Sequence, residues 1–187
     1  MSHKTLVAYA SRAGSTAEVA HTVGDVLRQA GIDADVRSVD DVPDLADYDS
    51  LILGSAIWAG KPIPETLQFM TRHRDEIARI PVAYFVLCEI LRNFTPSNRQ
   101  IALGYVAPLR QIKEPVSIAT FAGRRDLSTT HPIVRWLLLH LLPIAEGDWR
   151  DWDRIRDWAE AVGEKLVLAD TAAPDREERE VVEALAS

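Results

Sequence analysis

Residues 4–30 read KTLVAYASRAGSTAEVAHTVGDVLRQA, an apolar run followed by a loop of small residues and a longer periodic segment. The run at 6–9 is apolar without alternation, which is typical of a short strand buried on both faces. Apolar residues then recur with helical spacing, at Val19, Val23, Val26, Leu27 and Ala30. This stretch predicts a strand, a loop and a helix, the opening unit of an alternating α/β protein.

The loop between this strand and helix consists of Ser11, Arg12, Ala13, Gly14, Ser15 and Thr16. The first turn of a helix leaves backbone N–H groups without intrahelical partners and carries the positive end of the helix dipole. An anion is therefore a natural ligand, and a phosphate monoester would suit the hydroxyl groups and the close backbone approach. The alternative is an ordinary turn in which Ser15 or Thr16 only caps the helix. The loop alone does not decide between them.

Length and composition limit the class of protein. A chain of 187 residues with 47% hydrophobic content predicts one well-buried domain. The net charge of −7 argues against non-specific nucleic-acid binding. The single cysteine excludes an internal disulfide framework, and no apolar N-terminal segment resembles a signal peptide, so we expect a cytoplasmic protein. The histidines lack metal-ligand spacing, so we expect no metal site.

The end of the chain is strongly acidic. Residues 170–187 hold six acidic side chains against two arginines. Such a charge run predicts a solvated acidic tail that follows a domain spanning residues 1–169.

The rest of the chain continues to alternate strands and helices. Further strands are expected at 32–36, 51–54, 82–87 and 116–122. Helices are expected after Pro64, with Leu67, Met70 and Ile77 on one face; after Thr95, with Ile101, Tyr105, Leu109 and Ile112 on one face; and from near Asp151. The pattern predicts a three-layer α/β sandwich around a five-stranded parallel sheet, and the edge-like second strand favours the order 2-1-3-4-5.

Ligands of such sheets bind beyond the carboxyl ends of the central strands, where four loops of this chain should meet. Besides residues 11–16, these loops comprise Ser55, Ala56, Ile57, Trp58, Ala59 and Gly60; Leu87, Cys88 and Glu89; and Gly123, Arg124 and Arg125. One loop resembles a phosphate cradle and another offers Trp58 between small residues. A planar aromatic ligand with a phosphate tail would be satisfied at both ends.

On these motifs the chain resembles the flavodoxin family over about residues 4–168, and within it the flavodoxin-type, quinone-dependent protoporphyrinogen dehydrogenases. The similar segments are the opening strand and loop and residues 54–60, 121–124 and 147–152. The resemblance implies that residues 11–16 hold the phosphate of FMN and that residues 55–60 border its ring. It also implies that residues 87–89 and 123–125 close the other side of the ring. It assigns no catalytic side chain, because the redox chemistry belongs to the cofactor.

The resemblance implies an FMN-dependent oxidoreductase that passes electrons from an organic small molecule to a quinone, in haem biosynthesis. The alternative is a flavodoxin-like carrier that moves electrons between protein partners, and a flavin-free interaction domain is a third reading. An apolar insertion at about 124–147 favours the enzyme, whereas the acidic charge favours the carrier. Residues 132–145 are apolar nearly all round but too short to cross a bilayer, which leaves a core segment, a homodimer contact and a peripheral membrane contact open.

Overall fold

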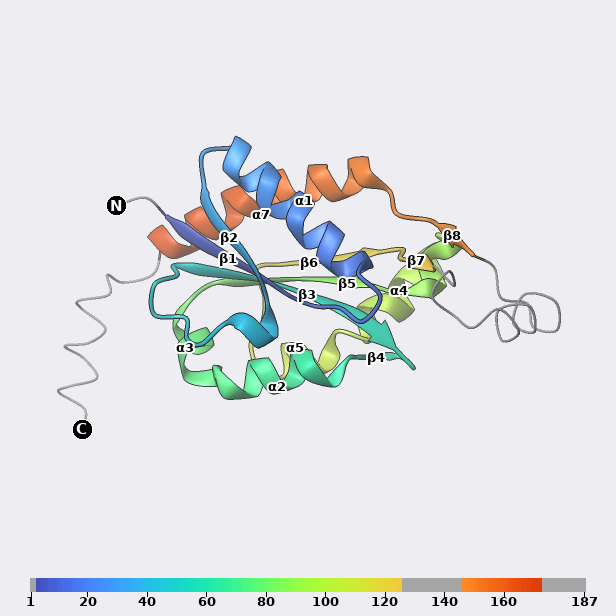
Figure 1. Ribbon diagram of the computed structural model, residues 1–187, viewed down its shortest axis with the longest axis horizontal. Coiled ribbons are helices and arrows are strands. Elements are labelled where there is room, and N and C mark those ends of the chain that lie inside the picture. Colours follow the sequence, from blue (N-terminus) through green and yellow to red (C-terminus); the bar gives the residue numbers. More distant parts are fainter. Residues whose placement is uncertain (1–2, 126–145, 173–187) are drawn as a thin grey trace.

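The computed structural model describes residues 3–125 and 146–172 (Figure 1). Its first half contains β1 (Lys4–Ala10), α1 (Ser15–Gln29), β2 (Asp33–Ser38), η1 (Val39–Asp41), β3 (Ser50–Trp58), β4 (Lys61–Pro62), α2 (Pro64–Arg72) and α3 (Arg74–Arg79). Its second half contains β5 (Val82–Leu87), η2 (Glu89–Arg92), α4 (Pro96–Gly104), α5 (Ala107–Arg110), β6 (Ser117–Phe121), β7 (Arg124–Arg125), β8 (Gly147–Asp148) and α7 (Trp152–Thr171). The insertion segment 126–145 and the acidic residues 173–187 lie outside the described residues.

The central sheet runs β2-β1-β3-β5-β6 with every neighbouring pair parallel, which confirms the predicted class and strand order. The strand β4 pairs antiparallel with the end of β3, and β7 and β8 form a separate ribbon. Across the sheet, Ala10 pairs with Ser55, Ala56 with Leu87, and Leu87 with Phe121. The carboxyl ends of the four central strands therefore lie in register at one edge.

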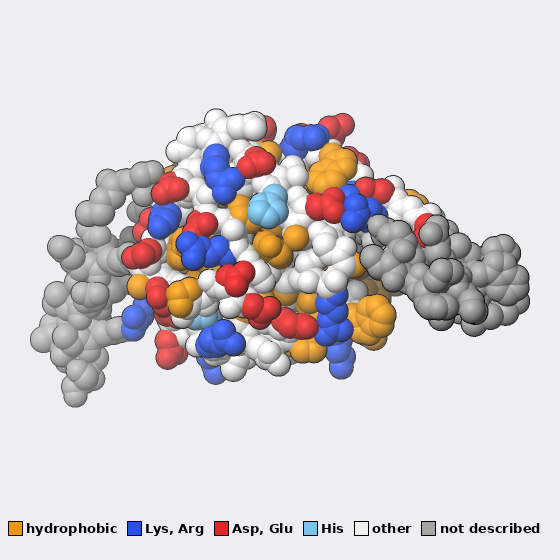
Figure 2. All heavy atoms as spheres, viewed as in Figure 1, with side chains coloured by type: hydrophobic (Ala, Val, Ile, Leu, Met, Phe, Trp, Pro, Cys, Tyr) orange, Lys and Arg blue, Asp and Glu red, His pale blue; other side chains and the backbone are white. Residues whose placement is uncertain are grey.

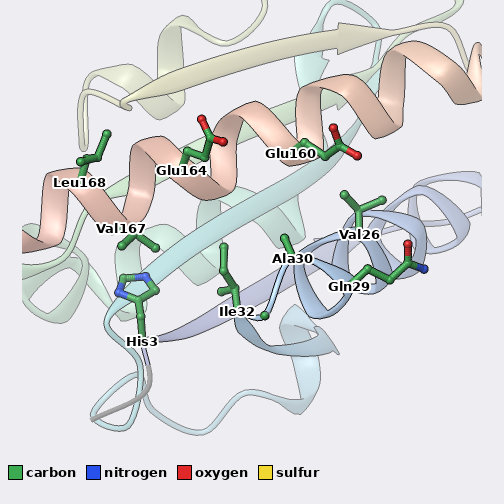
Figure 3. A pocket seen from close by; sticks show the side chains of 10 residues that line it. His3, Val26, Gln29, Ala30, Ile32, Glu160, Glu164, Val167 and Leu168 are labelled. Atoms are coloured by element: carbon green, nitrogen blue, oxygen red, sulfur yellow. The ribbon is translucent and has the colours of Figure 1, made fainter.

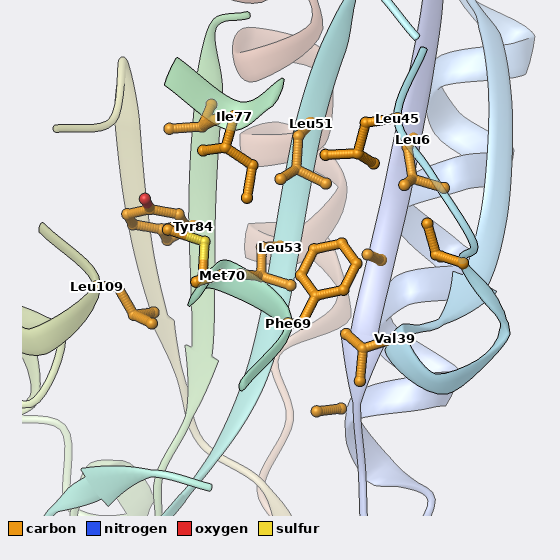
Figure 4. Packing of buried hydrophobic residues seen from close by; sticks show 14 of the residues in the cluster. Leu6, Val39, Leu45, Leu51, Leu53, Phe69, Met70, Ile77, Tyr84 and Leu109 are labelled. Carbon is orange, nitrogen blue, oxygen red and sulfur yellow. The ribbon is translucent and has the colours of Figure 1, made fainter. Parts of the chain in front are cut away.

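Helices cover both faces of the sheet (Figure 1). Along each central strand, successive side chains enter opposite cores, as the pleat of a strand requires. One core lies under α2, α3 and α5 and takes Leu6, Ala8, Leu51, Leu53, Val82, Tyr84 and Val86 from the strands. The other lies under α1 and α7 and takes Val7, Ile52, Ala83, Phe85, Leu87, Ala119 and Phe121. Figure 4 shows Phe69 and Met70 of α2 beside Leu53 in the first core.

Capping residues set the helix ends that the sequence predicted. The Oδ1 of Asp151 accepts a hydrogen bond from the Arg154 backbone N–H at 3.1 Å, so α7 begins at the next residue. Thr95 caps α4 in the same way, with Pro96 in the first turn. Gly31 adopts φ 83° directly after the C-cap of α1, a conformation that glycine reaches without steric cost.

Four local predictions differ from the structure. The single helix expected after Thr95 is divided into α4, which ends at Gly104, and α5 (Ala107–Arg110), so Ile112 lies beyond both. Residues 55–58, expected in a loop, continue β3 as far as Trp58 because the chain turns back there and pairs with β4. The single helix expected after Pro64 is divided into α2 and α3 at His73, whose buried ring packs on Phe69 and donates from Nδ1 to a Glu76 carboxylate oxygen at 2.6 Å. Ile101, expected on a buried stripe, is 42% exposed.

The edge strand β2 carries a hydrogen-bonded carboxylate. The Tyr48 hydroxyl donates to Asp35 at 2.8 Å, and Arg37 Nε donates to the same oxygen at 2.7 Å. Burial opposes ionisation of Asp35, but these hydrogen bonds outweigh it and hold its pKa below the usual value. A carboxyl with a lowered folded pKa contributes stability above the ordinary pKa of about 4, and this stability is lost as the pH falls through the folded value.

We therefore expect Tyr48→Phe to lower the free energy of unfolding by about 1 kcal/mol at pH 7, since one bond to a partly exposed charge is removed. The difference from the unaltered protein should shrink as the pH falls below the ordinary value of about 4 and through the lowered folded pKa of Asp35. Urea unfolding at pH 7 and pH 3 measures both values. An equal difference at the two pH values would contradict the assignment.

Candidate functional site

The loop at residues 11–16 ends on a helix that no side chain caps. Gly14 occupies the N-cap position of α1 with φ 81°, and within the described residues the first turn has no side-chain cap hydrogen bond. A Cβ atom at Gly14 would meet nothing within 4 Å. The capping interpretation of Ser15 and Thr16 is therefore wrong. The first-turn N–H groups of the helix remain available to an external acceptor.

Two hydroxyl groups in this loop are buried without a hydrogen-bond partner. Only Ser11 Oγ, Thr16 Oγ1 and His73 Nε2 are buried side-chain atoms of this kind among residues 3–125 and 146–172. An unsatisfied buried hydroxyl costs on the order of 1–3 kcal/mol, so native proteins keep few of them. An anion with several acceptor oxygens would satisfy both hydroxyl groups together with the helix N-terminus. The loop thus fits a phosphate group.

Charged side chains surround the loop in neutralising pairs. Glu18, in the first turn of α1, would repel an anion if it were free. Its carboxylate instead lies 3.0 Å from Arg124 and 2.8 Å from Arg150, and the Arg150 side chain is only 3% exposed. Arg12 reaches away to Glu65 at the start of α2, at 3.1 Å. The two guanidinium groups thus neutralise the Glu18 carboxylate, which would otherwise oppose an anion at the positive end of the α1 dipole.

Arg150 connects three parts of the chain. Besides Glu18 it contacts Asp148 at 2.6 Å, and its guanidinium lies 4.5 Å from the ring centroid of Trp152. The hydrogen bond to Asp148 raises the pKa of Arg150 and lowers the pKa of Asp148. Glu18 and Arg150 are 132 positions apart, so the sequence offered no signal for this pair beyond the resemblance over 147–152.

Residues 55–60 form a hairpin tip rather than a free loop. Ser55 is buried, with its Oγ 2.7 Å from Thr66 Oγ1, while Ala56 and Ile57 pack against the core under α2. Ala59 and Gly60 both have positive φ, 49° and 77°, which turns the chain back into β4. Trp58 at the tip is 72% exposed. A large aromatic side chain is therefore held on a tight turn at the carboxyl edge of the sheet.

The two remaining loops are joined to each other. Cys88 is buried, and its backbone N–H donates to Phe121 O at 3.0 Å. Burial raises the pKa of the Cys88 thiol to about 12, so at neutral pH it is protonated and serves packing. Glu89 forms an ion pair with Arg125. The loops at 87–89 and 123–125 are therefore held side by side.

The ribbon β7–β8 closes the base of the insertion. Arg124 pairs with Asp148, and Arg125 with Gly147, while the Trp149 backbone N–H donates to Gly123 O at 3.3 Å. Both ends of the segment 126–145 consequently leave from the loop that follows β6 (Figure 1). All four sequence-predicted loops meet at the carboxyl edge of the sheet.

A separate hollow of about 850 Å³ lies between α1 and α7, at the amino end of the strands (Figure 3). Its walls combine apolar side chains such as Val26 and Leu168 with the carboxylates of Glu160 and Glu164. Two carboxylates disfavour a phosphate ligand. The donors and the arginines described above lie at the other end of the sheet, so the hollow is not the candidate site.

Comparisons with known proteins agree with this geometry. The protoporphyrinogen IX dehydrogenase [quinone] of Escherichia coli strain K12 is 23% identical over 176 residues, which cover 85% of this chain and 94% of that protein. A flavodoxin from the domain Archaea superposes with a TM-score of 0.55 at 17% identity, covering 87% of this chain and 98% of that one. Oxidised Flavodoxin 1 from Bacillus cereus superposes with a TM-score of 0.52 at 17% identity, covering 88% and 97%.

A family model described as Flavodoxin domain matches residues 6–148. The match includes the phosphate-fitting loop, the Trp58 hairpin and the ribbon at the base of the insertion. The structural neighbours share the fold of this chain. The chain belongs to the flavodoxin domain family, and its cofactor is FMN.

Proposed function

We propose that this protein is an FMN-dependent oxidoreductase that oxidises an organic substrate and delivers the electrons to a quinone, with protoporphyrinogen IX as the substrate to test first. The observation that carries the proposal is the β7–β8 ribbon, which starts and ends the apolar segment 126–145 beside the cofactor loops. A protein that only carries electrons needs an exposed flavin edge and a charged rim. The E. coli relative, similar over most of its length, supports the same choice.

The residues of this chain have three tasks in that reaction. The hydroxyl groups of Ser11 and Thr16 and the start of α1 bind the phosphate and set the position of the ring. Trp58 covers a ring face, and the joined loops at 87–89 and 123–125 limit the access of water. When bound, FMN supplies the chemistry of accepting a hydride and of giving up electrons to an acceptor. Overall, the substrate loses hydrogen and the quinone becomes a quinol.

No side chain is assigned as a catalytic acid or base. Cys88 keeps its proton, and Glu89 is engaged by Arg125. A proton released from the substrate can pass to water at an exposed edge. The reaction therefore depends on groups that position the flavin and the substrate, and it requires no acid–base pair with shifted pKa values.

Trp58 provides a direct test of the ring position. Trp58→Ala is expected to leave the free energy of unfolding of the apoprotein within about 0.5 kcal/mol, because the side chain is 72% exposed. It should weaken FMN binding by about tenfold, since one aromatic face is lost. Titration of flavin fluorescence measures the affinity, and urea unfolding provides the control. Unchanged affinity would show that the ring lies elsewhere.

An electron carrier is the second candidate, because the chain has a net charge of −7. On the face shown in Figure 2, acidic and basic side chains are interspersed over the described part. Complementary charge would direct such a surface to basic redox partners. A carrier would exchange electrons with a protein and remain oxidised in the presence of the small molecule.

The deciding experiment is anaerobic reduction of the FMN-loaded protein. Protoporphyrinogen IX should bleach the visible absorbance of the flavin, and added menaquinone should restore it. Reduction by a chemical donor but not by protoporphyrinogen would reject the proposed substrate and leave the carrier. The matched control is the Ser11→Ala, Thr16→Val variant without bound flavin, which should oxidise no substrate.

Contacts with a membrane or a second copy are also proposals. Within the described ranges, no helix is long and apolar enough to cross a bilayer. We propose that 132–145 contacts the inner face of the membrane, where apolar quinones reside, in an otherwise cytoplasmic protein. Co-sedimentation with lipid vesicles tests this contact. A homodimer through the same segment would instead appear as a doubled mass in solution.

A further inference from the structure

Four side chains beside the cofactor loops form two reciprocal cation–aromatic contacts. Arg92 of η2 lies 5.5 Å from the ring centroid of Trp149, and Arg154 of α7 lies 4.2 Å from the ring centroid of Phe94. The segment after β5 thus supplies one arginine and one ring, and the segment after β8 supplies the others. We call Arg92, Phe94, Trp149 and Arg154 the arginine–aromatic patch.

Much of the patch is open to solvent, and its arginines have no acidic partner among the described residues. Phe94 is 52% exposed, and both arginines are exposed. In the part of the chain that the structure describes, Arg92 and Arg154 form no ion pair, whereas Arg12, Arg110, Arg124, Arg125 and Arg150 each lie against a carboxylate. A guanidinium held over a ring by a cation–aromatic contact still has N–H donors to offer a ligand. These donors suit the carboxylate of a ligand.

The patch adjoins the expected position of the flavin ring. Arg92 follows Glu89 by three residues, and Glu89 is bound to Arg125 in the loop after β6. Trp149 is tied to Gly123 of the same loop through its backbone N–H. The patch therefore extends the edge of the cofactor site toward α7.

The charge around the patch differs in sign from the rest of the chain. Residues 88–99, 121–125 and 146–156 together hold seven arginines and five acidic residues, in a chain with net charge −7. A local excess of positive charge on an acidic protein favours an anionic ligand at this place. The aromatic rings add an apolar surface that a small inorganic anion would not need.

We propose that the arginine–aromatic patch binds the carboxylate groups of an apolar, ring-containing carboxylic acid and so positions the organic substrate beside the flavin. This inference rests on the proposed function and names the substrate class. Arg92 and Arg154 are positioning residues that hold the acidic side arms. Phe94 and Trp149 cover the apolar body of the substrate. Protoporphyrinogen, whose propionate groups project from an apolar macrocycle, belongs to this class.

A purely structural clamp predicts different behaviour. If the two contacts only pin the segment after β5 to α7, their removal lowers stability without regard to the carboxylates of a ligand. The test therefore compares a free acid with its ester, which has the same apolar body. Protoporphyrin IX and its dimethyl ester are suitable probes, because they can be followed by fluorescence anisotropy with no turnover.

The variants are Arg92→Gln with Arg154→Gln, and the matched control is Arg99→Gln, an exposed arginine of α4 that also has no acidic partner among the described residues. The FMN-loaded protein should bind the free acid at least about tenfold more tightly than the ester. The double variant should bind the acid as weakly as the ester, whereas the control should match the unaltered protein. Restoring charge with Arg92→Lys and Arg154→Lys should recover part of the affinity.

Two results would overturn the inference: equal binding of acid and ester, or a double variant that folds and still prefers the acid. Thermal unfolding and FMN titration show whether the double variant is folded. The proposed function fails separately. If the protein binds the acid through these arginines but protoporphyrinogen does not bleach the flavin, the role of the patch stands and the proposed reaction is rejected. If protoporphyrinogen bleaches the flavin but acid and ester bind equally well, the proposed function stands and the role of the patch is rejected.

Discussion

Combining Ser11→Ala with Thr16→Val is expected to weaken FMN binding by at least about a hundredfold while leaving the apoprotein as stable as before or more stable. The two hydroxyl groups are buried and have no partner among the described residues. A hydrogen bond to a charged group contributes about 1.5–3 kcal/mol, so losing two costs about 3 kcal/mol or more of binding free energy.

The opposite effect on the apoprotein distinguishes a ligand site from a structural turn. Removing an unsatisfied buried hydroxyl relieves a desolvation cost, and valine keeps the shape of threonine. Flavin fluorescence titration and urea unfolding of the apoprotein measure the two effects. Thr71→Val is the control, because Thr71 donates to Leu67 O on the exposed face of α2. A large loss of apoprotein stability with undiminished FMN binding would contradict the phosphate assignment.

Gly54→Ala is expected to lower the free energy of unfolding by about 3 kcal/mol or more, at the upper end of what overpacking a core costs. Gly54 pairs with Phe85 in the centre of the sheet, and a Cβ atom there would lie 2.1 Å from Phe85 Cζ. The ring cannot move aside, because Phe85 is fully buried and packs edge-on against Trp158 at 5.9 Å. Urea unfolding measures the loss.

Two further variants separate this clash from a general effect of replacing glycine. Gly104→Ala, where a Cβ would meet nothing within 4 Å, should be neutral or stabilise α4 by up to about 1 kcal/mol. Adding Phe85→Leu to Gly54→Ala should cost less than the sum of the two single changes, since the smaller side chain makes room. Simple additivity would show that the ring is not the obstacle.

Local sequence patterns were sufficient to predict most of the fold. Continuous apolar runs in the strands and helical spacing in α1 and α7 reflect which faces must be buried, and each signal is contained within a few residues. The strand order followed from the alternating run in β2, which marks an edge. The break at His73 was missed because it depends on a buried side-chain contact with Glu76 that has no signature in the apolar spacing.

The sequence by itself determined the α/β class, the strand order, and the placing of the phosphate-fitting loop and three other loops at one edge of the sheet, because parallel connections leave no other place for them. Only the tertiary structure decided which side chains and which short ribbon contact one another at that edge. The pairing of Glu18 with Arg150, the ribbon at the base of the insertion and the arginine–aromatic patch join residues separated by about twenty to more than a hundred positions. Such contacts arise from packing in space, and spacing along the chain does not encode them.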